Sequence, residues 1–531
     1  MSRSYIDCLR AISSDELYEG LLGYGLFADK LPPVFTSEKF YAYCKEEEVE
    51  TNNKKLSFGK CSKDYVRYDS CRNTHATRRL GIPVPFAYYD LCVFLKDKWK
   101  DLLDYFELKT KDQIYKRSQI HIQKLSQKRT LFEMNHEYVD RDVDLEGEIY
   151  NLRTLSTYKV EADISSCFPS IYSHAFAWAI DGKQNAKNNK SKAKGNEKTL
   201  GDAIDYFSRS LKSNETNGVL IGPHTSNLLS EIILCAVDNK LVSKNYQYVR
   251  KIDDYCCYVE SESKANEFLL DLNSYLREFE LSLNVKKTKI TKLPQADNTD
   301  WVARLLQFSI DPLVTENGDK YFRFRRLELF VDHAICLAND TNNLSVYSYA
   351  MKMVGGYKLG KKALSHYTNS ILHLVYKYPY LVHWVDEYLF ERFNVSVDVI
   401  ERFCACVYDV GIQSKVYEAC AYSMYWGVKY KIKFSDKYAL DSINSGDCVF
   451  MAMALITSRV LQDGDAESKL KDHASYLLDE NEENMYLYWL FMYEALDKER
   501  ITDENFKRLK KKGVSFIRDE YLCKKKKMKR G

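Results

Sequence analysis

The fold is decided by Tyr248-Val-Arg-Lys-Ile-Asp-Asp-Tyr-Cys-Cys-Tyr-Val259, a stretch near the middle of the 531-residue chain. Two runs rich in β-branched and aromatic residues flank a pair of adjacent carboxylates, Asp253 and Asp254. This pattern predicts a strand, a two-residue turn and a second strand, with the acidic pair at the tip of the hairpin. Because neighbouring carboxylates repel each other, a fold that keeps them at a tight turn usually brings a cation there.

A third acidic residue follows another apolar stretch upstream. The segment Tyr158-Lys-Val-Glu-Ala-Asp163 predicts a strand that ends at Asp163, before the sequence Ser-Ser-Cys-Phe-Pro breaks it. An isolated Asp-Asp pair is more often a solvated turn than a site. An aspartate at a strand end beside an Asp-Asp hairpin, however, can hold two divalent ions for phosphoryl transfer. We therefore take all three aspartates as candidate catalytic residues.

The composition indicates a large folded protein of two or three domains, with 45% hydrophobic residues, 41 tyrosines and only 9 prolines. The net charge is +3, so a nucleic-acid surface would have to be local. The N-terminus has no apolar signal region and no uncharged run is long enough to span a bilayer. The 15 cysteines show no Cys-x-x-Cys spacing, which favours reduced thiols in a cytoplasmic protein.

Helices and loops are predicted on both sides of the acidic strands. Apolar periodicity predicts amphipathic or buried helices over residues 88–108, 228–241 and 264–280. Residues 181–196 carry five lysines among Gly, Asn and Gln, which predicts an exposed basic loop. Basic and apolar residues interleave over residues 111–130, as in a phosphate-facing element or a solvated helix face.

From about residue 300 onward the pattern changes to helix after helix. The exception is Asn317-Gly-Asp319, which predicts a hairpin turn. No sequence repeat identifies a named solenoid, so the expectation is an irregular, HEAT-like stack of helix pairs. Aromatic residues at helical spacing in this half are expected to be core or interface residues. They include Tyr417, Tyr422, Tyr425, Tyr486, Tyr488 and Tyr493.

Four segments, in this order, resemble the palm motifs of a reverse transcriptase. They are Asp163-Ile-Ser-Ser-Cys-Phe168, Gly218-Val-Leu-Ile-Gly-Pro-His-Thr-Ser226, Lys251-Ile-Asp-Asp254 and Leu283-Asn-Val-Lys-Lys-Thr288. More narrowly, the chain resembles the bacterial abortive-infection and defence-associated reverse transcriptases of the AbiK type. That resemblance rests on Ile82-Pro-Val-Pro85, the Gly182-Lys-Gln-Asn-Ala-Lys187 segment, the Ile-Gly-Pro-x-x-Ser form of the second motif and the all-helical C-terminal half.

The resemblance implies an α+β fold. Fingers at about residues 1–150 and a palm at about 151–300, an antiparallel sheet with helices, would form a right-hand-like reverse transcriptase domain over residues 1–300. An all-α domain would follow over residues 301–531.

The resemblance also implies two Mg²⁺ ions, for which Mn²⁺ is a substitute. Asp163 and Asp253 would bridge the ions, Asp254 would be more peripheral, and the carbonyl of Ile164 would be a further ligand. All of these ligands are oxygens, which suits Mg²⁺.

For the nucleotide, the resemblance assigns Phe168 to the sugar pocket, where it would exclude a 2′-hydroxyl and select deoxynucleoside triphosphates. Lys287 would approach the triphosphate, and Ser226, with His224, would flank the nascent base pair. Arg78, Arg79 or Arg129 would grip phosphates from the fingers.

Two positions depart from the usual motifs: Lys251 stands where a tyrosine is common, and Ile221 stands where a glutamine is common. Both departures fit defence enzymes that extend DNA from a protein hydroxyl such as a tyrosine of their own chain, sometimes without a template. We therefore expect an anti-phage DNA polymerase that forms trimers or hexamers, is not membrane-bound and carries its DNA product covalently on an unidentified tyrosine. The alternatives are a retron-like enzyme that copies a non-coding RNA, and an inactive RNA-binding or assembly module.

Overall fold

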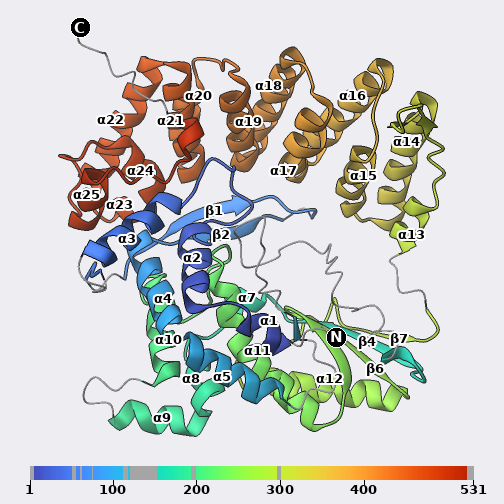
Figure 1. Ribbon diagram of the computed structural model, residues 1–531, viewed down its shortest axis with the longest axis vertical. Coiled ribbons are helices and arrows are strands. Elements are labelled where there is room, and N and C mark those ends of the chain that lie inside the picture. The colour runs from blue at the N-terminus through green and yellow to red at the C-terminus, as the bar shows by residue number, and fades with distance from the viewer. Residues whose placement is uncertain are drawn as a thin grey trace.

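The computed structural model describes residues 5–50, 56–59, 62–74, 76–111, 118–119, 152–192, 199–295 and 300–522. Figure 1 shows two parts: a mixed part that contains the main sheet, and a row of helices that lies along it. The helical C-terminal region and the sheet-and-helix N-terminal part confirm the predicted α+β fold class. No described helix is long and apolar enough to cross a membrane.

The main sheet has five strands in the order β3-β5-β6-β4-β7. The strands are β3 (Ser118–Gln119), β5 (Gln247–Lys251), β6 (Asp254–Val259), β4 (Tyr158–Asp163) and β7 (Lys289–Lys292). All pairs are antiparallel except β3 and β5. The predicted helices at residues 228–241 and 264–280 are α11 (Thr225–Ser243) and α12 (Glu262–Arg277), and α12 packs on β4 and β6.

The N-terminal part also contains a second, smaller hairpin of β1 (Val66–Ser70) and β2 (Arg78–Ile82). Its helices are α1 (Tyr5–Arg10), α2 (Ser14–Tyr24), α3 (Glu38–Glu50), α4 (Pro85–Asp97), α5 (Trp99–Thr110), α7 (Cys167–Ser170), α8 (Ala175–Asp181), α9 (Lys183–Lys192) and α10 (Leu200–Ser210). Most of the basic segment at residues 111–130 lies outside the described residues.

Two predictions in this part are wrong. The single helix over residues 88–108 is two helices, because Lys98 leaves helical geometry and lets α4 pack on α2 while α5 packs on α11. The basic segment at residues 181–196 is not all loop: Gly182, with a φ of +84°, ends α8, and α9 begins at the next residue. Residues 183–192 contain no Gly or Pro, so the polar composition does not prevent a helix.

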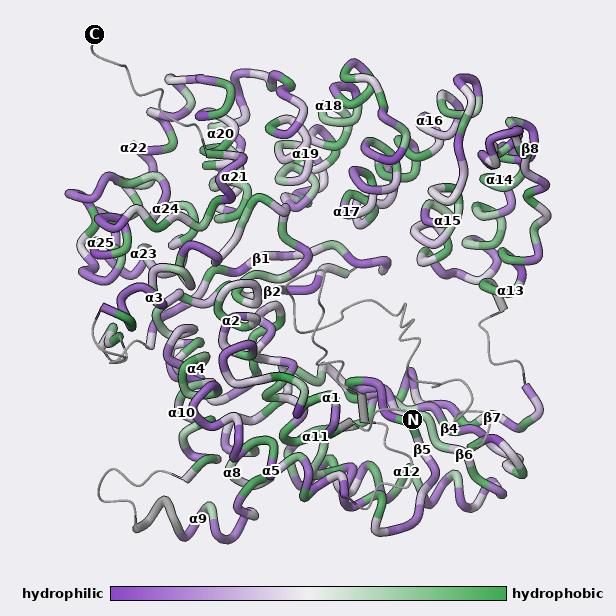
Figure 2. The backbone as a smooth tube through the Cα atoms, in the orientation of Figure 1, coloured by the Kyte–Doolittle hydropathy of each residue, from purple (hydrophilic) through white to green (hydrophobic). Residues whose placement is uncertain are grey.

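The row of helices begins after residue 300 and ends beside the N-terminal helices (Figure 1). It contains α13 (Asp300–Leu306), α14 (Phe324–Thr341), α15 (Ser345–Gly355), α16 (Lys361–Lys377), α17 (Val382–Val385), α18 (Val397–Ser414), α19 (Tyr417–Tyr430), α20 (Tyr438–Ser445), α21 (Cys448–Leu461), α22 (Gly464–Glu480), α23 (Asn484–Leu487), α24 (Trp489–Ala495) and α25 (Glu504–Lys511). The hairpin predicted around residue 318 is β8 (Leu313–Val314) with β9 (Lys320–Tyr321). Figure 2 shows hydrophobic and hydrophilic residues alternating along these helices, as expected when one side of each helix is buried.

An aromatic core joins the end of the row to the N-terminal helices. Trp489 and Phe516 lie 4.9 Å apart between ring centroids, and Phe516 lies 5.8 Å from Phe40 of α3. The backbone amide of Thr36 donates to the carbonyl of Phe516 at 2.9 Å. The two ends of the described chain therefore share one core.

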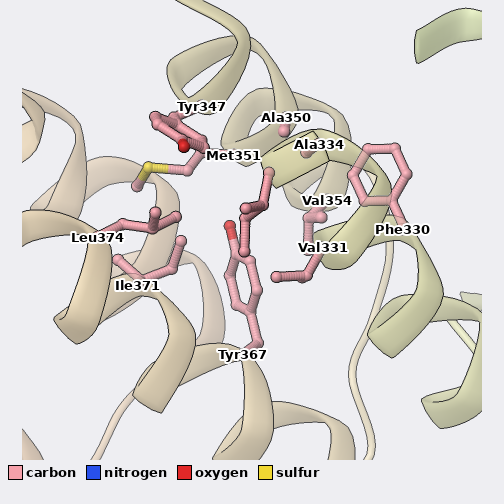
Figure 3. A pocket seen from close by; sticks show the side chains of 11 residues that line it. Phe330, Val331, Ala334, Tyr347, Ala350, Met351, Val354, Tyr367, Ile371 and Leu374 are labelled. Carbon is pink, nitrogen blue, oxygen red and sulfur yellow. The ribbon is translucent and has the colours of Figure 1, made fainter. Parts of the chain in front are cut away.

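A small cavity of about 20 Å³ lies between α14, α15 and α16 (Figure 3). Its lining is apolar apart from the hydroxyl groups of Tyr347 and Tyr367. The Tyr367 hydroxyl is buried and has no hydrogen-bond partner among the described residues. No acidic or basic side chain lines this cavity, so it does not fit a site of proton or phosphoryl transfer.

Candidate active site

The predicted acidic hairpin forms between β5 and β6. Its turn consists of Ile252 and Asp253, and Lys251 pairs with Asp254 across the hairpin. Ile252 has a φ of +55°, a conformation that costs a β-branched residue free energy. The surrounding structure must therefore hold this turn in place.

A buried ionic network holds the turn from behind. The guanidinium of Arg250 donates to the carbonyl of Ile252 at 2.8 Å, to both carboxylate oxygens of Glu231 at 3.0 and 2.9 Å, and to Asp238 at 2.9 and 2.7 Å. All three charged side chains are 0% exposed, and the Tyr248 hydroxyl donates to Asp238 at 2.9 Å. Burial alone would lower the pKa of Arg250, but Asp238 and Glu231 raise it well above its usual value. Sequence analysis did not identify this network.

The three candidate aspartates converge at the tip of the hairpin. Asp163 is the last residue of β4 and lies opposite Asp254 in the sheet register. Burial, together with the charge of Asp163, raises the pKa of Asp253. Burial and the charge of Asp253, together with Asp163, raise the pKa of Asp254 to about 7. The mutual repulsion that the sequence predicted is therefore present.

The fourth predicted motif runs alongside Asp163. Asn284 donates through its side-chain amide to one carboxylate oxygen of Asp163 at 2.8 Å, and the Lys287 ammonium donates to the other at 2.9 Å. The Lys287 side chain remains 60% exposed, so this lysine reaches the acids from solvent. Ile164, whose carbonyl was predicted to bind metal, pairs with Leu283 in a β-bridge and is 1% exposed.

The second predicted motif forms a loop at residues 216–224, here called the second-motif loop. Gly218 has a φ of +80°, and a Cβ at this position would lie 2.7 Å from the carbonyl oxygen of Pro169. The amide of Val219 donates to the carbonyl of Phe168 at 2.9 Å. The ammonium of Lys212 donates to the carbonyl of Asn217 at 2.5 Å, a contact that no sequence pattern indicated. This loop is thus fixed against the first motif.

The predicted nucleotide-binding residues are placed as follows. Phe168 is partly buried on α7, whereas Ser226 and His224 are 2% and 1% exposed at the start of α11. Arg78 begins β2, and burial, with the nearby charge of Arg72, lowers its pKa while Asp253 acts in the opposite direction. Arg79 is paired with Asp69 at 2.7 Å, and Arg129 lies outside the described residues.

The donor set determines which ion would fit here. Among the residues that the structure describes, no three His, Cys, Asp or Glu side chains already stand in a metal-binding arrangement. The converging ligands are all oxygens, and the pKa of Asp254 near 7 shows that their charge is poorly neutralised. Oxygen ligands and excess negative charge fit a hard divalent cation such as Mg²⁺.

Residues 105–304 match the family model for reverse transcriptase (RNA-dependent DNA polymerase). This part of the chain is therefore similar to a reverse transcriptase domain. The matched residues include all three candidate aspartates and the four motifs. No curated protein matches the sequence.

Several solved structures resemble the chain at low similarity. Telomerase from Candida tropicalis, in complex with a fragment of telomeric RNA, is 10% identical over 75% of this chain and 68% of that chain, with a TM-score of 0.29. Apo telomerase from the same organism is 13% identical over 79% and 76% of the two chains, with a TM-score of 0.29. Telomerase from Candida albicans is 10% identical over 85% and 70%, with a TM-score of 0.27. Values this low support no statement about what this chain binds.

Proposed function

We propose that this protein is a DNA polymerase that acts in defence against phage by abortive infection. The convergence of Asp163, Asp253 and Asp254 at one hairpin tip, within the matched reverse transcriptase domain, carries the proposal. Burial and neighbouring carboxylate charges raise the pKa of Asp253 and Asp254, so these acids have no structural use at a partly exposed turn. They do have a use in nucleotidyl transfer, where cations must be held beside the reacting phosphate.

In this proposal Asp163, Asp253, Asp254 and the carbonyl of Ile164 would hold two Mg²⁺ ions. When bound, the ions would promote deprotonation of the attacking hydroxyl and neutralise the leaving pyrophosphate. Lys287 pairs with Asp163 in this structure through a largely exposed side chain. A flexible ammonium is suited to exchanging that carboxylate for the triphosphate of an incoming nucleotide.

Selection of deoxynucleotides is assigned to Phe168. Its carbonyl accepts a hydrogen bond from the Val219 amide, so the backbone of the first motif lies against the second-motif loop. Replacing Phe168 with Ala should raise the use of ribonucleotides relative to deoxynucleotides. If the ring were only a core residue, the variant would instead lose roughly 3–5 kcal/mol of stability with unchanged sugar preference.

Protein priming is the finer part of the proposal. Lys251 and Ile221 replace the residues that usually contact primer and nucleotide, which favours synthesis from a tyrosine hydroxyl without a template. Tyr422, Tyr425 and Tyr493 are at most 5% exposed, so they are poor candidates within a single subunit. Tyr376 and Tyr476 are 53% and 59% exposed and are better placed to act. We also propose a trimeric or hexameric assembly, and a cytosolic location consistent with the free thiols of the described cysteines.

The test uses purified, nuclease-treated protein incubated with Mg²⁺ and labelled deoxynucleotides. We expect DNA that remains with the protein through denaturation and phenol extraction, with the link on a tyrosine by peptide mapping. Light scattering should report an oligomer. Synthesis that depends on co-purifying RNA would favour a retron-like enzyme. Absence of any incorporation would leave only an RNA-binding or assembly module.

A further inference from the structure

The β1–β2 hairpin lies between the helical row and the second-motif loop (Figure 1). On the side of the loop, the amide of Gly81 in β2 donates to the carbonyl of Ile221 at 2.9 Å. A Cβ at Gly81 would lie 2.7 Å from a methyl carbon of Leu220, so the strand and the loop are in close contact. The same strand begins at Arg78, whose charge acts on Asp253. Strand β2 therefore contacts the second-motif loop and also carries a basic residue whose charge acts on the acidic tip.

On the other side, the helical row holds the hairpin through one buried carboxylate. Glu418, near the start of α19, is 1% exposed. It accepts a hydrogen bond from the amide of Cys71 at 2.6 Å and one from the hydroxyl of Tyr68 at 3.3 Å. Tyr68 lies within β1 and Cys71 follows its last residue. Both hydrogen bonds therefore join the row directly to the hairpin.

The charge of Glu418 is maintained despite its burial. Burial alone would raise its pKa, but His383, together with hydrogen bonds from Cys71 and Ser70, holds the pKa below its usual value. Because burial lowers the pKa of His383 itself, the hydrogen bonds are the more dependable support for this charge. His383 lies 3.3 Å from the carboxylate and also pairs with the Tyr422 hydroxyl at 2.9 Å. Hydrogen bonds to an ionised acceptor are stronger than neutral ones, so this contact is suited to fixing the strand.

Two further hydrogen bonds join the hairpin to the helical row, one at the end of β2 and one just beyond β1. The indole N–H of Trp489 in α24 donates to the carbonyl of Ile82, the last residue of β2, at 3.2 Å. Beyond β1, the side-chain amide of Asn73 donates to the hydroxyl of Ser345 in α15 at 2.6 Å. The hairpin cannot shift toward or away from the acidic tip without breaking contacts to three helices of the row.

We propose that Glu418 is a positioning residue for nucleotide addition, through which the helical row fixes the β1–β2 hairpin and so places Arg78 and the second-motif loop at the acidic tip. This inference rests on the proposed polymerase function. It gives the C-terminal half a role in nucleotide affinity that is separate from subunit assembly.

The kinetic test compares Glu418→Gln, Arg78→Ala and the double variant. Because small misplacements of a positioned group have large kinetic effects, Glu418→Gln should raise the KM for deoxynucleotides about tenfold with a smaller change in kcat. In the Arg78→Ala background the same substitution should have a smaller effect than in the wild type, since part of its action passes through Arg78. A reduced kcat with unchanged KM, or two effects that multiply independently, would overturn the inference.

Glu494→Gln is the matched control. Glu494 is 8% exposed and accepts hydrogen bonds from the Ser515 hydroxyl and the Phe516 amide at 2.9 and 3.0 Å, and neither of these residues belongs to the hairpin. The KM of this variant should equal that of the wild type. If Glu418→Gln does not fold, Tyr68→Phe serves instead, because it removes one hydrogen bond to Glu418 with little change in volume.

Hydrogen exchange separates this inference from the proposed function, because it needs no activity. In Glu418→Gln the amides of Cys71 and Gly81 should exchange faster than in the wild type, and in Glu494→Gln they should not. If the wild type incorporates no nucleotide, the polymerase proposal fails. Hydrogen exchange then still tests whether Glu418 holds the β1–β2 hairpin in place. An unchanged exchange rate at Gly81 would overturn that contact.

Discussion

Two groups of carboxylates lie at the β5–β6 hairpin, and they differ in what balances their charge. Behind the hairpin, Glu231 and Asp238 share the guanidinium of Arg250, and none of these side chains is exposed. At the tip, three aspartates converge, and one of them, Asp163, pairs with the ammonium of Lys287, whose side chain is 60% exposed. The buried carboxylates are neutralised by an arginine within the core, whereas the lysine at the tip is largely exposed to solvent.

The difference separates structural acids from candidate catalytic ones. A buried, fully hydrogen-bonded cation leaves no demand for another ion. At the tip, burial and the charges of Asp253 and Asp163 raise the pKa of Asp254 to about 7, so a cation from solvent would be favourable there. The two groups are also joined, because Arg250 donates to the carbonyl of Ile252 in the turn that carries Asp253. The structural group therefore holds the candidate catalytic group in position.

The largest effect is expected from Arg250→Ala. Removing the guanidinium leaves Glu231 and Asp238 buried without their cation, which should lower the free energy of unfolding by about 3–5 kcal/mol. Chemical denaturation measures this loss. The control is Arg500→Ala, which breaks an exposed pair with Asp479 and should cost at most about 1 kcal/mol. Equal losses in the two variants would remove the distinction between the groups.

Neutralising one acid in each group should have opposite effects. Glu231→Gln weakens the pairing with Arg250 and should destabilise the protein. Asp253→Asn relieves repulsion at the tip and should raise the free energy of unfolding by about 1 kcal/mol in metal-free buffer, as is common when a functional residue is replaced. Thermal unfolding of both variants shows whether each substitution raises or lowers the free energy of unfolding. Destabilisation by Asp253→Asn would mean that the tip is also structural.

The stability of the metal-free protein should depend on pH through Asp254. The folded-state pKa is about 7, above the value of about 4 expected for the unfolded chain. Between these values the folded state binds more protons than the unfolded state, so this residue makes stability fall as pH rises through that window. Asp254→Asn should therefore gain more stability at pH 8 than at pH 5. Because the side chain is partly exposed, we expect less than about 1 kcal/mol, and an equal gain at both pH values would contradict this account.

The smallest effect is expected at a buried polar side chain that belongs to neither of the two carboxylate groups. The Tyr367 hydroxyl in the cavity between α14, α15 and α16 lacks a described partner and lies far along the chain from the acids. Tyr367→Phe should leave nucleotide incorporation unchanged and raise the free energy of unfolding by up to about 1 kcal/mol, because an unsatisfied hydroxyl is removed. Denaturation and incorporation assays on the same preparation test both parts. A loss of stability would indicate that the hydroxyl is solvated.

Local patterns predicted the acidic hairpin and the strand that ends at Asp163, because alternation and turn chemistry are readable within a few residues. The Arg250 network was not predictable, since an arginine in a strand does not show that Glu231 and Asp238, on a separate helix, lie beside it. The break at Lys98 was missed because the apolar periodicity continues through it while the two helices pack on different neighbours. The roles of Phe168, Lys287 and the aspartates in catalysis stay predictions.

The measurement that tests the central claim most directly is incorporation of labelled deoxynucleotides by wild-type protein and by Asp253→Asn, with and without Mg²⁺. The account predicts labelled product from the wild type only when Mg²⁺ is present. It predicts a loss on the order of a thousandfold in Asp253→Asn, since a ligand of a two-metal site is removed. Incorporation by Asp253→Asn at the wild-type rate would contradict it.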